Sequence, residues 1–221
     1  MLNIGLMLAG KFARAAVLWV RRHVRIVLLL VIVLGLMPAY LHAYRLTPDG
    51  VSEVPTLLPQ DIIIVNRAAY HFGFPYLNLV LFRTGAPKRG EMVLIILPNH
   101  RGVAPKRVMG LPGDMVELKD NRLVINSQGV SIKALNRSAF AHVPEEARMG
   151  SVVESEEGHW ITYTPGKGKY RDHPPVRLAE GEYFVLGDNR DESADSRVWG
   201  PIPELAVVGK VILKLPTGHR Q

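Results

Sequence analysis

The sequence of 221 residues contains no cysteine. Disulfides, thiolate catalysis and zinc–thiolate sites are therefore excluded, and the redox state of the compartment is left open. The eight histidines are scattered, and none forms the HxxxH or HExxH spacing of a helical zinc site. We therefore expect no metal site.

Acidic residues are missing from the first 25 positions, where five basic residues gather: Lys11, Arg14, Arg21, Arg22 and Arg25. The net charge of the chain is +7, but elsewhere its basic residues are interleaved with acidic ones. No module of alternating basic and aromatic residues is present, so we expect no nucleic-acid partner. A basic cluster of this kind instead suits the cytoplasmic side of a membrane.

Charged residues are also missing from 26–44, a run of 19 mostly apolar positions. A helix of that length spans about 28 Å, close to the hydrocarbon thickness of a bilayer. Because the basic cluster precedes it, we predict a single anchor in the lipid bilayer of the cytoplasmic (inner) membrane. Residues 1–25 would then be cytoplasmic, and 45–221 would form an exported domain on the outer or periplasmic side.

Two other interpretations of this run are weaker. A buried core helix fits neither its length nor its basic flank. A cleavable signal peptide would be cut near Ala43, but Pro38, Tyr40 and His42 make a poor small-residue site, and the preceding basic region is long. Residues 1–20 lie either along the membrane interface or in a cytoplasmic tail.

Short apolar or alternating runs follow the anchor, separated by turns rich in glycine and proline. Short apolar runs separated by such turns predict a mainly β fold, an antiparallel β-sheet domain. The expected strands are 61–65, 91–97, 115–120, 122–126, 159–164, 182–187 and 207–215. The aromatic and aliphatic stretch 68–86 is either a core hairpin or an exposed apolar patch that rests on the bilayer beside the anchor.

Three later segments contain more polar residues than a buried core would require. In the first, 49–57, Ser52 lies between a glycine and a proline, and alone it indicates only a turn. In the second, 105–114, Lys106 leads an apolar run, and alone it indicates a surface lysine. Lysine is a poor base in water because its reference pKa is about 10.4, but burial can lower that value. A lysine on a buried strand edge can then accept a serine proton.

The third segment, 187–200, directly follows a predicted strand and mixes hydroxyl groups with opposite charges. In this order the three segments resemble the signature boxes of bacterial type I signal peptidase, or leader peptidase. Residues 52–57 are similar to the serine box S-M-x-P-T-L. Residues 106–114 match K-R-V-x-G-x-P-G-D, and 187–200 match G-D-N-R-x-x-S-x-D-S-R-x-W-G throughout. Residues 89–93 correspond to an intermediate R-G-D/E-V-V segment, and the resemblance covers roughly 26–215.

The resemblance implies a membrane-bound serine endopeptidase that removes N-terminal signal peptides from exported preproteins, by a mechanism that needs no metal or other cofactor. Ser52 would attack the scissile carbonyl, with Lys106 as general base and Ser193 hydrogen-bonded to the lysine amine. The Ser52 backbone N–H would be one oxyanion donor. Gly50 stands where some relatives carry a second hydroxyl donor, so that donor would have to be backbone or water.

The resemblance also assigns structural support of the site to Asp188 and to an ion pair between Asp195 and Arg197. The family's variable cap would correspond to about 121–180, within which 127–158 is the least informative part. Glu53 departs from the family, which usually has methionine after the serine. In an extended segment it would point away from Ser52, whereas facing the dyad it would hold a proton on Lys106 and weaken the base.

We therefore expect retained activity with a shifted substrate preference, and Glu53→Met should not raise turnover by orders of magnitude. One alternative is a specialised maturation peptidase with a narrow substrate range, acting on a pilin or a conjugation protein. A second is a catalytically weak homologue that binds signal peptides without cutting, which Glu53 alone favours. A soluble self-cleaving repressor-like protease shares the dyad, but the anchor and the lack of a DNA-binding domain argue against it.

Overall fold

The computed structural model describes residues 19, 21–29, 40–74, 79–98, 102–134, 152–156, 158–164 and 168–217. The chain divides into two compact units, Met1–Tyr40 and Leu41–Gln221. In the first unit the described residues are helical. No helix within the described ranges is long and apolar enough to cross a membrane. Residues 30–39, the middle of the predicted anchor, lie outside them.

The predicted end of the anchor is wrong, because residues 41–44 belong to the first strand of the second unit. Strand β1 (Leu41–Arg45) pairs antiparallel with β2 (Ile62–Asn66) along its whole length. Tyr44 packs, partly buried, against one of the core clusters. The apolar residues at the end of the run therefore serve a sheet, whose backbone groups satisfy one another in the ladder. The β domain begins at Leu41 rather than at 45.

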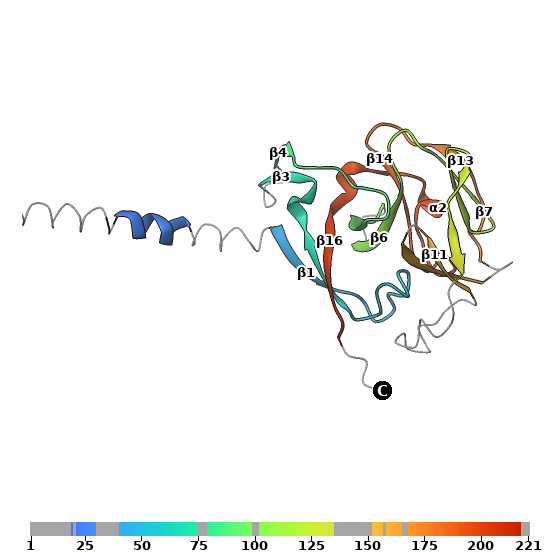
Figure 1. Ribbon diagram of the computed structural model, residues 1–221, viewed down its shortest axis with the longest axis horizontal. Helices are drawn as coiled ribbons and strands as arrows, with labels where there is room; N and C mark the ends of the chain where they lie inside the picture. The colour runs from blue at the N-terminus through green and yellow to red at the C-terminus, as the bar shows by residue number, and fades with distance from the viewer. Residues whose placement is uncertain are drawn as a thin grey trace, which may run out of the picture. The chain divides into compact units, whose positions relative to one another are not determined.

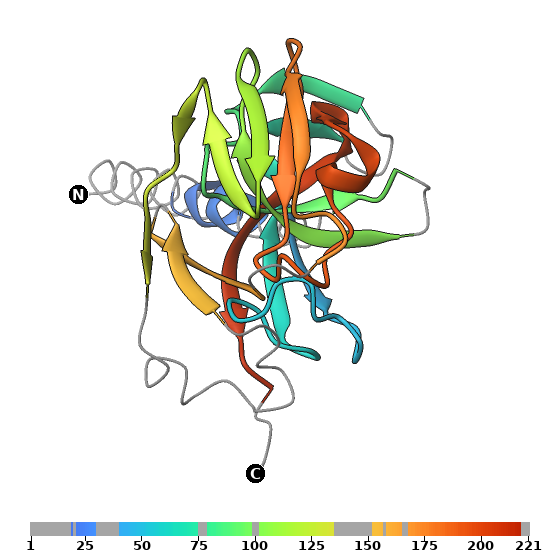
Figure 2. The ribbon, with the colours of Figure 1, turned by 90° about the vertical axis from the view of Figure 1, so that its right-hand side faces the viewer.

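A seven-stranded sheet forms the centre of this domain, in the order β1-β2-β16-β5-β6-β14-β15 (Figure 1). Every neighbouring pair in it is antiparallel. Its other strands are β5 (Met92–Ile96), β6 (Val103–Gly110), β14 (Glu182–Leu186), β15 (Ile202–Pro203) and β16 (Val207–Leu215). Figure 2 shows β16, in red, running down the domain toward the C-terminal end.

Three smaller antiparallel sheets complete the domain. The first joins β13 (His173–Arg177), β7 (Met115–Lys119), β8 (Arg122–Ile125) and β9 (Gln128–Gly129); the second joins β10 (Ile132–Ala134), β11 (Val152–Glu156) and β12 (His159–Tyr163); and the third joins β3 (His71–Phe74) to β4 (Leu79–Arg83). Short helical turns lie at η1 (Arg67–Ala69), α2 (Ser196–Trp199) and η5 (Glu204–Ala206). The predicted mainly antiparallel β fold is confirmed.

The predicted cap, 121–180, contains the strands β8 to β13, and its stretch 135–151 lies outside the described residues. The core consists of three clusters of buried apolar side chains. In β2 the buried residues Ile63 and Val65 alternate with partly exposed neighbours, the period expected of a strand with one face on the core. β6 instead is buried over its last six residues because it lies inside the large sheet.

The stretch 68–86 contains the β3–β4 hairpin, which lies on the surface rather than in the core. Val80, Leu81 and Phe82 are 48%, 53% and 56% exposed. The rings of Phe72 and Phe82 stack with their centroids 5.1 Å apart. An exposed apolar patch is therefore present on this hairpin, and its contact with a bilayer stays a prediction.

Candidate active site

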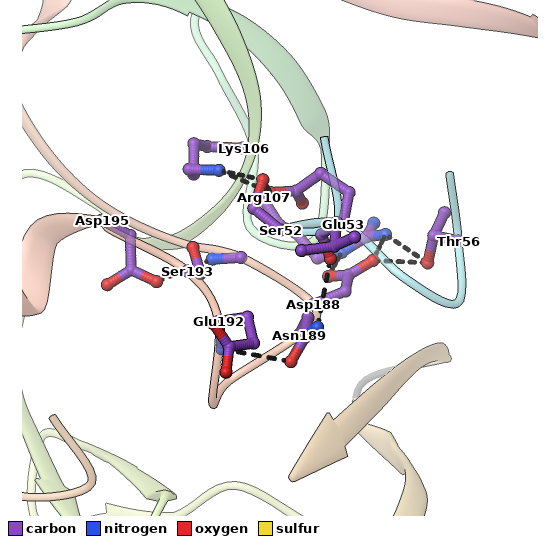
Figure 3. Close-up of polar contacts among 12 residues, drawn as sticks. Ser52, Glu53, Thr56, Lys106, Arg107, Asp188, Asn189, Glu192, Ser193 and Asp195 are labelled. Carbon is purple, nitrogen blue, oxygen red and sulfur yellow. Dashed lines mark hydrogen bonds and ion pairs between the residues drawn. The ribbon is translucent and has the colours of Figure 1, made fainter. Parts of the chain in front are cut away.

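Ser52 and Lys106, which lie 54 positions apart in the chain, meet in the β domain. Lys106 Nζ donates a hydrogen bond to Ser52 Oγ at 2.8 Å (Figure 3). Lys106 is only 2% exposed. The lysine lies on a central strand of the large sheet, because β6 runs between β5 and β14 and Lys106 pairs with Val93. A central strand fixes the backbone of the lysine more firmly than an edge would.

Ser52 lies in the loop between β1 and β2, and this loop is a compact series of turns. Val54 N donates to Val51 O at 3.2 Å, and Leu57 N donates to Glu53 O at 2.9 Å. Val54 and Leu57 are buried, at 0% and 2% exposure, so their side chains fasten the loop to the core. The buried apolar residues that follow the serine thus help to hold the loop, and with it the Ser52 hydroxyl, in place.

The loop 187–200 reaches Ser52 because it leaves β14 next to the lysine. Leu186, the last residue of β14, pairs with Arg107 on β6. Three residues later, Asn189 N donates to Ser52 O at 3.0 Å, and Asn189 Nδ2 donates to Val51 O at 3.1 Å. These bonds fix the backbone of the serine loop from the side of β14.

Gly187 stands at the closest approach of the two loops. A Cβ atom there would lie 2.1 Å from Ser193 Oγ and 2.5 Å from Ser52 O. Neither distance is compatible with a side chain, so the loops can pack this closely only around glycine.

Asp195 and Arg197 form the predicted ion pair in the interior of the loop 187–200. Arg197 Nε and Nη2 each donate to the Asp195 carboxylate at 2.8 Å, and both side chains are buried. Gly187 N donates to the same carboxylate at 2.9 Å. Burial alone would raise the pKa of Asp195, but the Arg197 charge and these hydrogen bonds outweigh it and leave that pKa below its ordinary value. The pair therefore fixes the shape of the loop.

Asp188, the other predicted supporting residue, is paired with Arg107. Arg107 Nε and Nη2 donate to its two carboxylate oxygens at 2.7 and 2.6 Å, and the Thr56 hydroxyl also donates to it. The pair thus ties β6, the serine loop and the loop 187–200 together. Arg107, Thr56 and Asn189 were not singled out from the sequence, although each lies inside a signature box.

Glu53 faces the dyad, the second of the two orientations that the sequence left open. Residues 52–56 form turns rather than an extended segment, and alternation of side chains therefore does not apply. Glu53 Oε1 accepts hydrogen bonds from Lys106 Nζ at 2.7 Å and from Ser52 Oγ at 3.1 Å. Burial raises the pKa of Glu53 to about 7, although the charge of Lys106 acts to lower it.

Ser193 does not make the contact expected of it. Its hydroxyl is buried but has no hydrogen-bond partner among the described residues. The Lys106 amine instead donates to Ser52 and to Glu53. The carboxylate therefore takes the place that the resemblance assigned to the Ser193 hydroxyl.

An open cleft of about 520 Å³ gives access to the dyad. Its lining is mixed polar and apolar and comes from all three signature segments and from the ends of β5 and β6: Asp49, Gly50, Val51, Ser52, Leu97, Pro98, Ala104, Lys106, Glu192, Ala194 and Trp199. Over the described part of the chain, no cluster of three or more His, Asp or Glu side chains is placed to hold a metal ion. The arrangement suits a hydroxyl nucleophile acting on a substrate that enters the cleft.

Comparison with known proteins identifies relatives along most of the chain. The family model described as "Signal peptidase, peptidase S26" matches residues 19–215. Signal peptidase I of Pseudomonas fluorescens is 34% identical over 182 residues, covering 74% of this chain and 61% of that protein. Signal peptidase IB of Staphylococcus aureus (strain COL) is 33% identical over 170 residues, covering 75% of this chain and 73% of that protein.

Among solved structures, the crystal structure of a signal peptidase I from Enterococcus faecalis V583 matches with a TM-score of 0.37 and 28% identity. The match covers 58% of this chain and 98% of that one. The chain spans 61% of the length of the Pseudomonas fluorescens and Pseudomonas aeruginosa relatives.

Proposed function

The chain belongs to the signal peptidase family, peptidase S26, and we propose that it is a serine endopeptidase that removes signal peptides from exported preproteins. The observation that carries the proposal is the hydrogen bond between Lys106 Nζ and Ser52 Oγ inside the cleft. A buried lysine within 2.8 Å of a serine hydroxyl is positioned to accept its proton. The nucleophile and the base each come from a segment that matches a family signature.

In this mechanism the neutral Lys106 amine takes the proton from Ser52 Oγ as Oγ bonds to the scissile carbonyl carbon. The lysine then gives that proton to the leaving amine, and an acyl-enzyme on Ser52 remains. A water molecule then attacks the ester carbonyl and passes a proton to the Lys106 amine. The bond from Oγ to the acyl carbon breaks, the acyl fragment leaves as a carboxylic acid, and the lysine returns the proton to Ser52 Oγ. No step needs a group from outside the chain other than substrate and water.

Charge that develops on the carbonyl oxygen needs donors near Ser52. Among the described residues, the Ser52 backbone N–H donates to no backbone carbonyl. This supports its role as one oxyanion donor. Gly50 supplies no side chain, so a second donor on this side would be backbone or water.

Location at the cytoplasmic membrane is part of the proposal. The charge-free run that leads up to Tyr40 and the basic residues before it support a single anchor with a cytoplasmic N-terminus. The exposed apolar side chains of the β3–β4 hairpin support a further contact with lipid. Both features support a membrane location for the enzyme, which is where signal peptides emerge.

The proposal is tested by cleavage of a model preprotein in detergent micelles by the wild-type chain, Ser52→Ala and Lys106→Ala. Both variants should lose cleavage, because each removes one half of the proton transfer. Ser131→Ala, which changes an exposed serine before β10, is the control and should cleave normally. Full activity in Ser52→Ala or Lys106→Ala would disprove the dyad, and a wild type that binds the preprotein without cutting it would disprove the peptidase.

A further inference from the structure

Glu53 makes contacts that a serine–lysine dyad does not require. Its Oε1 atom accepts from both Lys106 Nζ, at 2.7 Å, and Ser52 Oγ, at 3.1 Å, while Nζ and Oγ are themselves 2.8 Å apart (Figure 3). Three groups from two segments of the chain thus form a closed triangle of hydrogen bonds. Lys106 and Glu53 are 2% and 1% exposed, so solvent does not compete for these contacts.

We propose that Glu53 is the positioning residue for Lys106: it holds Nζ against Ser52 Oγ and stabilises the ammonium that forms there. The role rests on the proposed function, because it has meaning only if Ser52 and Lys106 react. The buried aspartate of a serine–histidine–aspartate triad acts on its histidine in the same two ways. Here the carboxylate comes from the residue next to the nucleophile.

The proton balance of the step is complete within the site. As Oγ bonds to the scissile carbon, the Ser52 O–H bond breaks and the proton passes to the neutral Lys106 amine. The resulting ammonium lies against the Glu53 carboxylate until it gives the proton to the leaving amine. Glu53 stays ionised throughout and exchanges no proton, so it acts through the lysine.

Ser193 does not hold the Lys106 amine in this structure. Within the described residues its hydroxyl has no hydrogen-bond partner, and the Lys106 amine has two, Ser52 and Glu53. A flexible lysine side chain must be held for its amine to face the nucleophile, because an amine misplaced by about 1 Å can cost a hundredfold in rate. Glu53 is the described group that supplies this restraint.

The other charged side chains near Lys106 and Glu53 either form ion pairs of their own or line the cleft. Arg107 on β6 and Asp188 after β14 act on Glu53 and are paired with each other. Asp195 acts on Lys106 and is paired with Arg197. Two further carboxylates line the cleft, those of Asp49 and Glu192. Burial raises the pKa of Glu53 to about 7, so its carboxyl is ionised above that pH.

A carboxylate at this distance has two opposite effects on the reaction, and these make the proposal testable. Its negative charge favours the ammonium over the neutral amine, so its removal should favour the neutral amine that acts as the base. Its hydrogen bond holds Nζ in place, so the rate at the pH optimum is higher. Glu53→Gln should therefore move the acid limb of kcat/KM to lower pH by about 1–3 units. It should also lower kcat on the plateau about tenfold to a hundredfold.

The experiment measures kcat and KM of the full chain on a preprotein in detergent micelles, from about pH 5 to about pH 10. Glu53→Gln keeps the shape of the side chain, and Glu53→Met removes the charge with the residue that the family usually carries. In both variants the acid limb of kcat/KM should lie at lower pH than in the wild type, and kcat should be reduced with little change in KM. Glu180→Gln, which removes an exposed carboxylate from the turn before β14, should match the wild type.

A plateau kcat that stays unchanged or rises, or an acid limb that does not move, in either Glu53 variant would overturn the proposal. A rise in kcat at every pH would instead identify Glu53 as an inhibitory latch on the lysine. Thermal unfolding shows whether each variant is folded, and only the kinetics of a folded variant are used to decide the outcome. Ser52→Ala is measured in parallel, because activity in that variant would disprove the dyad itself rather than the role of Glu53.

Discussion

At the scale of single residues, the closeness of the two loops at Gly187 makes this glycine a sharp test of the site. A Cβ atom at 187 would overlap Ser193 Oγ and the Ser52 carbonyl, so Gly187→Ala must push the serine loop away from β6. We expect kcat/KM to fall at least about a hundredfold, since a displacement of about 1 Å in a nucleophile has that effect. Steady-state cleavage of a preprotein measures it. Gly129→Ala, where nothing lies within 4 Å of the added Cβ, is the control. Equal kcat/KM in the two variants would show that the loops are farther apart than the structure has them.

The Asp195–Arg197 pair predicts a dependence of stability on pH. Because the pKa of Asp195 lies below its ordinary value of 3.8, its contribution is present above that value. The contribution is lost as pH falls through the lower, folded-state value. Asp195→Asn leaves a buried arginine unpaired, which should cost about 3–5 kcal/mol of unfolding free energy near neutral pH.

Urea unfolding of the full chain in detergent, repeated between about pH 7 and about pH 2, measures this difference. The difference in unfolding free energy between the wild type and Asp195→Asn should become smaller as the pH falls. The reason is that protonation of Asp195 removes the ion pair from the wild type as well. Asp120→Asn is the matched control, since Asp120 is 63% exposed and its contact with Arg171 is 3.5 Å long. That change should cost less than about 1 kcal/mol at any pH. A gap that stays constant down to the lowest pH would mean that Asp195 is not ionised in the folded protein.

At the scale of elements, the β3–β4 hairpin is predicted to touch lipid. Phe82→Trp places a fluorescent ring on the exposed apolar side of the hairpin without changing its character. In vesicles, its emission should shift to the blue and be quenched by brominated lipid, because an indole ring at the membrane interface leaves water. Leu215→Trp is the control: Leu215 is also exposed, but it pairs with Ile62 at the end of β2 remote from the hairpin. Equal quenching at the two positions would disprove a specific contact of the hairpin.

The elements differ in how far the sequence alone predicts them. The strands β2, β5, β7, β8, β12, β14 and β16 lie where short apolar runs between turns predicted them, because each run carries its own burial pattern. β1 was missed since its residues continue a long apolar run, and only the pairing with β2 separates strand from anchor. The three boxes predicted that Ser52 and Lys106 meet. The inward turn of Glu53 depends on the backbone of 52–56 and on Lys106 from a distant strand, which no local pattern encodes.

At the scale of the whole molecule, the position of β1 predicts where the chain can be divided. A chain that begins at Leu41 keeps the complete seven-stranded sheet, so it should fold and cleave a short peptide while being retained in membranes more weakly, through the hairpin alone. A chain that begins at Leu46, close to the boundary that the apolar run suggests, lacks β1 and exposes the backbone edge of β2 and the side of the core that Tyr44 covers.

We expect the shorter chain to lose about 1–3 kcal/mol of unfolding free energy, the contribution of burying part of one large side chain and of the ladder hydrogen bonds. It should also aggregate, because an unpaired edge with Ile62 and Ile64 on it is a template for pairing with a second chain. Urea unfolding and light scattering of the two chains measure both effects. Equal stability would mean that β1 is dispensable and that the anchor extends to residue 44. A less stable shorter chain would place the junction between membrane and enzyme at Leu41, leaving eleven residues from the start of the sheet to the nucleophile.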